Sequence, residues 1–138
     1  MVTEVVVKES LSSEMISAGA ELTRLLDEAG FHVSASLWLY LSDANAWRFI
    51  VATPGVRDNG PKKAYEEIRS VLAKIPDKHA KIEFRDISAV DADSDPLISL
   101  MRFVFKLSGI NGIRFTNNVI NGVLIEDAYI LTLRRAKL

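Results

Sequence analysis

The sequence predicts an α+β fold: a mixed sheet of five to six strands with three helices, in the order β-α-β-β-α-β-α-β-β. Two segments have the pattern of β-hairpins, which give antiparallel neighbours, whereas strands separated by helices favour parallel pairing. Three helical segments are apolar enough to cover such a sheet. A length of 138 residues fits one α+β domain, residues 1–138.

The N-terminal part of the chain predicts a short strand and then a helix. Residues 2–8 contain three consecutive valines, which favour a strand. Ser12 or Ser13 is a suitable N-cap for the helix, and Gly30 suits its left-handed end. Between them the apolar side chains recur at helical spacing. They are Met15, Ala18, Leu22, Leu25, Leu26 and Ala29.

Residues 31–53 have the pattern of an antiparallel hairpin, with a turn at Ser42–Asn45. A turn of that length aligns four aromatic residues on one face. The predicted cross-strand pairs are Trp38 with Phe49 and Tyr40 with Trp47. This aromatic face could be core beneath a helix, a dimer surface or a base-stacking platform. Core is the favoured interpretation, and base stacking is disfavoured because the neighbouring polar positions do not form a basic groove.

The middle of the chain predicts a second helix, a strand and a third helix. Pro61 suits the first turn of a helix that ends before Pro76. Residues 81–87 (KIEFRDI) favour a strand. Asp95 is then a good cap for a helix over residues 96–107. That last helix is apolar nearly all round, so it is either central or covered by a partner.

The last hairpin is identified by Asn121-Gly122, because both central residues of a type I′ turn need positive φ. A rival turn at Asn117-Asn118 would shift the register, and the glycine favours the first choice. The favoured turn sets the cross-strand pairs. They are Ile120 with Val123, Val119 with Leu124, Asn117 with Glu126 and Thr116 with Asp127.

This hairpin has an apolar tip, which needs cover from its own domain or from another chain. The possibilities are a hairpin folded over its own core, an arm that builds a dimer, or a catalytic pair at Glu126 and Asp127. The catalytic interpretation is the weakest. Neighbouring residues of a strand point to opposite faces, so these two carboxylates would not share one site.

The loop over residues 54–63 and the helix N-terminus after it form the best candidate for a small-molecule site. Arg57, Lys62 and Lys63 could hold a phosphate or carboxylate group on the free amides of that helix. The simpler interpretation, and the favoured one, is that both lysines point into water. The glycine spacing and the Gly-Lys-Ser/Thr of a nucleotide-binding loop are missing.

Other motifs for metal or catalytic chemistry are incomplete. Residues 91–96 place acids at alternate positions as a calcium loop does, but lack its glycine and its final glutamate. Residues 76–85 resemble, in part, the Pro-Asp…Glu-x-Lys pattern of restriction-type nucleases. Here Asp77 lies close before Glu83, and Arg85 stands where the lysine should be. We therefore assign no catalytic residue, metal or cofactor, and a nuclease-like protein is the least favoured alternative.

The composition excludes several classes of protein. With 17 basic and 18 acidic residues the net charge is −1, so there is no strong signal for nucleic-acid binding. The absence of cysteine excludes disulfides, thiolate zinc sites and cysteine nucleophiles. No signal peptide or membrane span is predicted, so we expect a soluble, cytoplasmic protein. The ending Ala136-Lys137-Leu138 is close to a peroxisomal signal, and chance explains it better.

The apolar content, 49% of residues, is generous for one small domain. The sequence therefore predicts a non-enzymatic protein-interaction module, most simply a homodimer. Its interface would lie on the 98–105 helix or on the tip of the last hairpin. The candidate interface residues are Met101, Phe105, Val119, Ile120, Val123 and Leu124. The alternative function is a binder or enzyme for an anionic small molecule at the 54–63 loop.

Overall fold

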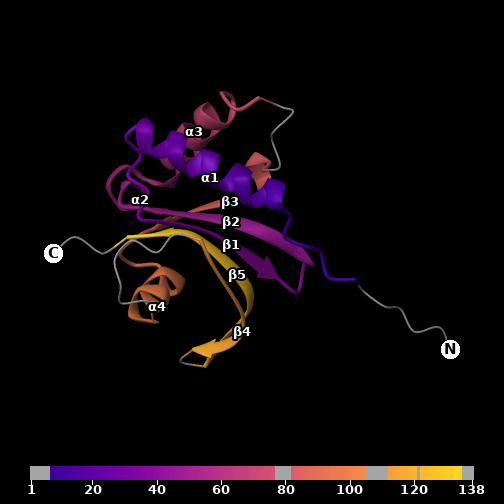
Figure 1. Cartoon of the computed structure of the whole chain (residues 1–138). Coiled ribbons are helices and arrows are strands. Elements are labelled where there is room, and N and C mark those ends of the chain that lie inside the picture. Colours follow the sequence, from indigo (N-terminus) through magenta and orange to yellow (C-terminus); the bar gives the residue numbers. More distant parts are fainter. Residues whose placement is uncertain (1–6, 77–81, 105–111, 121, 135–138) are drawn as a thin grey trace.

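The structure is a computed structural model, and it describes residues 7–76, 82–104, 112–120 and 122–134 (Figure 1). The helices are α1 (Ser13–Glu28), α2 (Gly55–Asn59), α3 (Pro61–Leu72) and α4 (Pro96–Val104), with a 3-10 helix, η2 (Phe84–Asp86). The strands are β1 (Ala35–Leu41), β2 (Ala46–Thr53), β3 (Ile87–Asp91), β4 (Ile113–Ile120) and β5 (Val123–Leu133). The predicted α+β class is confirmed.

The sheet is mixed, with the strand order β3-β2-β1-β5-β4. β3 runs parallel to β2, and the other neighbouring strands are antiparallel. The predicted register of both hairpins is confirmed, since Trp38 pairs with Phe49 and Val119 pairs with Leu124. The rival turn at Asn117-Asn118 is therefore wrong. The predicted pair of Asn117 with Glu126 is not formed, because Asn117 leaves the extended conformation with a φ of 50°. Gly122 adopts the positive φ of 79° that the favoured turn requires.

The two faces of the sheet have different covers (Figure 1). α1 and α3 lie on one face and enclose the core that contains the aromatic side chains. α4 lies on the opposite face, where Ile98 and Met101 pack under aliphatic residues of β1, β2 and β5. The outer ends of β4 and β5 curve toward the side of α4. The sheet therefore has two separate apolar clusters, one on each face.

The ends of α1 form as predicted. Ser12 is the N-cap, and its side chain accepts a hydrogen bond of 3.1 Å from the amide of Met15. At the other end Gly30 has a φ of 83°, and the amide of Phe31 reaches back to the carbonyl of Leu26 at 3.0 Å. Between these ends Gly19 lets the helix approach the sheet closely. A Cβ atom there would lie 2.8 Å from Phe49 and from Leu131.

Three local predictions were incomplete or wrong. The predicted loop after β2 contains α2, because Pro54 adopts helical dihedral angles and starts a short helix. The strand predicted at residues 81–87 begins only at Ile87, because Glu83 and Asp86 cap the 3-10 helix η2 before it. The helix predicted to end at Pro76 ends at Leu72.

The predicted N-terminal strand over residues 2–8 lies mostly outside the described residues. Its described end is not a strand and is held by side chains instead. Asn45 donates a hydrogen bond to the carbonyl of Val7 and accepts one from the amide of Glu9, both at 2.9 Å. Among the helices that the structure describes, none is long and apolar enough to cross a membrane.

Candidate functional site

The aromatic face of the first hairpin is core in this structure, as the favoured interpretation had it. The four side chains have exposed fractions of 8% or less: Trp38, Tyr40, Trp47 and Phe49. The polar atoms of these rings are satisfied. For example, the Trp38 indole donates to the carbonyl of Met15 at 3.0 Å, and the Tyr40 hydroxyl donates to Asn45 at 2.7 Å. This face is therefore closed to a partner.

The tip of the last hairpin is not covered. We use "hairpin tip" for Val119, Val123 and Leu124, which are 67%, 50% and 61% exposed. Val119 and Leu124 lie directly opposite each other on neighbouring strands. They therefore share one face of the ribbon and form a continuous apolar surface. The remaining large apolar residues that are exposed in the described part of the chain, Val7 and Ile113, lie elsewhere.

The other predicted interface residues have different outcomes. Met101 is fully buried, because α4 packs its apolar side against the sheet. Met101 is therefore unavailable to a partner, and its assignment to the interface was wrong. Phe105 and the side chain of Ile120 lie outside what the structure describes. The available part of the predicted interface is the hairpin tip.

The two acids of β5 have separate environments. Glu126 has a buried Oε2 atom without a hydrogen-bond partner in the described part of the chain. Asp127 is 1% exposed and accepts hydrogen bonds from Lys8 at 2.7 Å and from Arg114 at 2.8 and 3.1 Å. Burial by itself raises the pKa of Asp127. The hydrogen bonds from Arg114 and Lys8 outweigh that effect and leave the pKa below its ordinary value. Lys8 also lies over the Tyr40 ring, 4.6 Å from its centroid. This arrangement is that of a structural ion network.

The three basic residues of the 54–63 segment lie in different environments. Arg57 is directed to Asp91, with 3.8 Å between Nε and Oδ2. Lys62 is exposed. Lys63 lines a cavity. Of the candidate anion-binding residues, the structure therefore brings only Lys63 to a concave surface.

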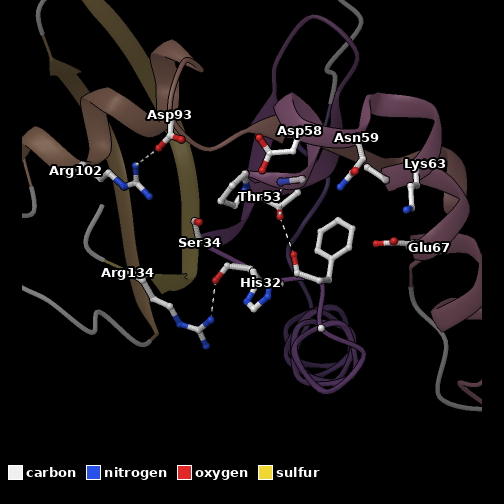
Figure 2. Close-up of a pocket in the computed structure, with 16 residues that line it drawn as sticks. His32, Ser34, Thr53, Asp58, Asn59, Lys63, Glu67, Asp93, Arg102 and Arg134 are labelled. Carbon is white, nitrogen blue, oxygen red and sulfur yellow. Dashed lines mark hydrogen bonds and ion pairs between the residues drawn. The ribbon is translucent and has the colours of Figure 1, made fainter. Parts of the chain in front are cut away.

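That cavity, which we call the end cavity, has a volume of about 570 Å³ and lies beyond the carboxyl ends of β2 and β3 (Figure 2). In open sheets that contain parallel strands, ligands bind at such ends. Its walls come from α2, the first turns of α3, the last turn of α4 and the residue after β5, with Asp93 from the loop between β3 and α4. The volume lies within the range of about 300–1,000 Å³ that is typical of small-molecule sites.

The floor of the end cavity is the turn between α1 and β1. His32 has a φ of 58° there, a left-handed conformation that is uncommon outside glycine. Hydrogen bonds from neighbouring elements fix this turn. Thr53 donates to the carbonyl of Phe31 at 2.7 Å, and Asp27 accepts from the amide of Val33 at 3.1 Å. The surrounding structure therefore maintains the strained conformation.

Two arginines lie on one side of the end cavity. Arg134 forms a bidentate pair with Asp27, at 2.7 and 3.1 Å, and donates to the carbonyl of Val33 at 2.7 Å. Burial raises the pKa of Asp27, but the Arg134 bonds and the Val33 amide hold it below the ordinary value. Arg102 donates to the carbonyl of Ala92 at 3.0 Å. Its Nε is buried and has no hydrogen-bond partner in the described part of the chain.

Sequence reasoning missed the residues that shape this cavity. His32, Arg102 and Arg134 were not singled out. A usable signal existed: Arg102 interrupts an otherwise apolar helix, and Arg134 directly follows an apolar strand. No group of three or more acids and histidines among the described residues could hold a metal ion. Comparisons with protein-family models, curated proteins and solved structures find no match to this chain.

Proposed function

We propose that this chain is a protein-interaction module that self-associates through the tip of its last hairpin. The observation that carries the proposal is the exposure of Val119, Val123 and Leu124, between 50% and 67%, at the end of the β4–β5 ribbon. Val119 and Leu124 form contiguous apolar surface on one face of the ribbon end, which is typical of an interaction site, and Val123 lies on the other face. A second copy of the chain is the simplest partner, since it offers the same surface and a closed two-fold contact.

The hairpin tip alone is too small for a strong interface. Stable complexes bury about 800 Å² on each partner, and three side chains do not reach that area. β4 can supply more surface, because it is the edge strand of the sheet and also exposes Ile113 (37%). Within the described residues no strand pairs with its outer side, so its backbone groups there are free to bond another copy.

Asn117 restricts how far such an edge contact can extend. Its φ of 50° interrupts the extended backbone in the middle of β4. An interruption of this kind limits edge-to-edge pairing. We therefore expect weak self-association, with a Kd on the order of 10–100 µM.

Sedimentation equilibrium from about 10 µM to about 1 mM covers the range in which such a weak interface dissociates. We expect the unaltered chain to shift from monomer to dimer across this range. Leu124→Lys places a charge in the apolar contact and should shift the change from monomer to dimer to higher concentrations. The expected effect is a rise in Kd of at least about tenfold.

Val7→Lys is the matched control, because Val7 is a similarly exposed valine (77%) away from the tip. It should leave the dimerisation constant unchanged. A chain that stays monomeric at the highest concentration would contradict the proposal. So would an equal loss of dimer in both variants, because that result would reflect general surface charge rather than the tip.

A further inference from the structure

The charged groups around the end cavity leave an excess of positive charge on one side and an excess of negative charge on the other, with Asp93 4.0 Å from Arg102 on the positive side (Figure 2). Arg102 and Arg134 lie on one side, where α4 and β5 end. Asp58 and Glu67 lie on the opposite side, on α2 and α3. Across a cavity, such an arrangement complements a molecule that carries both a negative and a positive group.

Arg102 provides an anchor for an anionic group. One of its terminal nitrogens is held by the carbonyl of Ala92, so the position of the guanidinium is fixed. Its Nε is buried, and none of the described residues accepts its hydrogen. A buried donor without a hydrogen-bond partner is energetically unfavourable, and a carboxylate oxygen would satisfy it. In Figure 2 the guanidinium of Arg102 points from α4 toward the cavity.

The opposite side offers acceptors for a cationic group. Asp58 and Glu67 line the cavity, and the carboxylate of neither has a hydrogen bond or ion pair with any described residue. Lys63 lies between them on the chain and offsets one of the two negative charges. The charge that remains favours an ammonium group over a second anionic group.

The formal charges of the lining disfavour a simple anion. Three acids, Asp58, Glu67 and Asp93, balance the three permanent cations Lys63, Arg102 and Arg134. A phosphate group bound at Arg102 would lie near these carboxylates and would be repelled by their negative charge. Phe31, Val33 and Ala64 add an apolar part to the wall, which suits the side chain of a small ligand.

We propose that the end cavity binds a small zwitterion, namely a free α-amino acid, with its carboxylate on Arg102 and its ammonium facing Asp58 and Glu67. This site is separate from the hairpin tip and does not depend on self-association. The fixed turn at His32 provides a prearranged floor, so little ordering is needed on binding.

Isothermal titration calorimetry with the full chain tests this proposal. The probes are each of the common L-amino acids, with acetate, n-butylammonium and inorganic phosphate as comparison probes, up to about 10 mM, which reaches the weakest class of specific affinity. We expect saturable binding of at least one amino acid with an apolar side chain. Acetate, n-butylammonium and phosphate should bind at least about tenfold more weakly, since each lacks one of the two charges.

Arg102→Lys is the sharpest variant, because lysine keeps the charge but lacks the Nε–H donor. It should weaken binding of the amino acid by about tenfold or more. Asp58→Asn changes an exposed residue, so the chain should still fold. It should weaken binding of the amino acid but leave binding of acetate unchanged. Lys62→Gln is the matched control, one position from Lys63 but outside the cavity, and should change nothing.

Three results would overturn the proposal. The first is no saturable binding of any amino acid at the highest concentration. The second is equal affinity for phosphate or acetate, which would make the cavity a plain anion site. The third is an unchanged affinity in both Arg102→Lys and Asp58→Asn. Self-association measured on the same samples separates these results from any failure of the hairpin tip, since the two sites share no residue.

Discussion

The two hairpins of this protein are both rich in apolar residues, yet only one of them is covered. The aromatic pairs of the β1–β2 hairpin lie under α1 and α3, with exposed fractions of 8% or less. The tip of the β4–β5 hairpin has no such cover, and its three apolar residues are at least 50% exposed. The difference shows that an apolar strand pattern predicts a need for cover but does not identify what provides it.

The two hairpins should also differ in how much they contribute to the stability of the fold. Burial of a large side chain stabilises the fold by about 1.5–3 kcal/mol relative to exposure, so the aromatic hairpin should contribute to the stability of the monomer. The hairpin tip has little of its surface buried in the single chain. It should therefore contribute to association rather than to folding.

The largest expected effect is at the covered hairpin. Trp38→Ala should lower the free energy of unfolding by about 3–5 kcal/mol, because the indole is 1% exposed and its removal leaves a large cavity. Chemical denaturation monitored by far-UV circular dichroism measures this change. An effect below about 1 kcal/mol would mean that the aromatic face is not the main core and would remove the contrast between the hairpins.

An intermediate effect is expected at Asp127 on β5, the strand of the uncovered hairpin that pairs with β1 of the covered one. Asp127→Asn should cost about 1–3 kcal/mol at neutral pH, since it removes the charged partner of Lys8 and Arg114. Those two cations are each 46% exposed and can be hydrated instead, which limits the cost. Asp43→Asn, in the exposed turn of the first hairpin, is the control and should have no effect.

The same network predicts how stability depends on pH. The pKa of Asp127 is lower in the folded chain than its ordinary value of 3.8. Its contribution is therefore fully present well above pH 3.8, and it is lost as the pH falls from there through the folded pKa. The free energy of unfolding should decrease over that acid range, and Asp127→Asn should make the decrease shallower. If the free energy of unfolding of the variant decreases at acid pH as steeply as that of the unaltered chain, the network does not stabilise the fold.

The smallest effect is expected at the uncovered hairpin. Leu124→Ala should change the free energy of unfolding by no more than about 0.5 kcal/mol, because the side chain is 61% exposed. The measurement is made at a protein concentration well below the dissociation constant of the proposed dimer. Denaturation at two protein concentrations separates folding from association. A loss above about 2 kcal/mol in the monomer would place the tip in the core and reverse our interpretation.

Much of the fold could be predicted because its signals are local. Ser12 and Gly30 mark the ends of α1, and the spacing of turn residues sets the register of both hairpins. The errors arose where local signals compete. In residues 81–87 a strand-like composition lost to the mutual capping of Glu83 and Asp86, and Pro54 started a helix inside an expected loop.

The candidate site was harder to predict, because its residues meet only through tertiary structure. Lys63 was identified from a local rule about helix N-termini. Its partners across the end cavity, Arg102 and Arg134, come from elements distant in the sequence. No spacing rule connects α3 with α4 and the end of β5. Met101 illustrates the opposite error, since an apolar helix can be central as easily as it can be an interface.

β5 connects the hairpin tip with the end cavity. This strand of 11 residues, about 36 Å long, begins beside the hairpin tip and ends beside the end cavity. It is hydrogen-bonded to β1 and to β4, so it cannot shift without moving a neighbour. This strand is therefore a direct backbone connection between the two proposed sites. A ligand that shifts β5 on binding would change the dimerisation constant by the same factor by which dimerisation changes the ligand affinity.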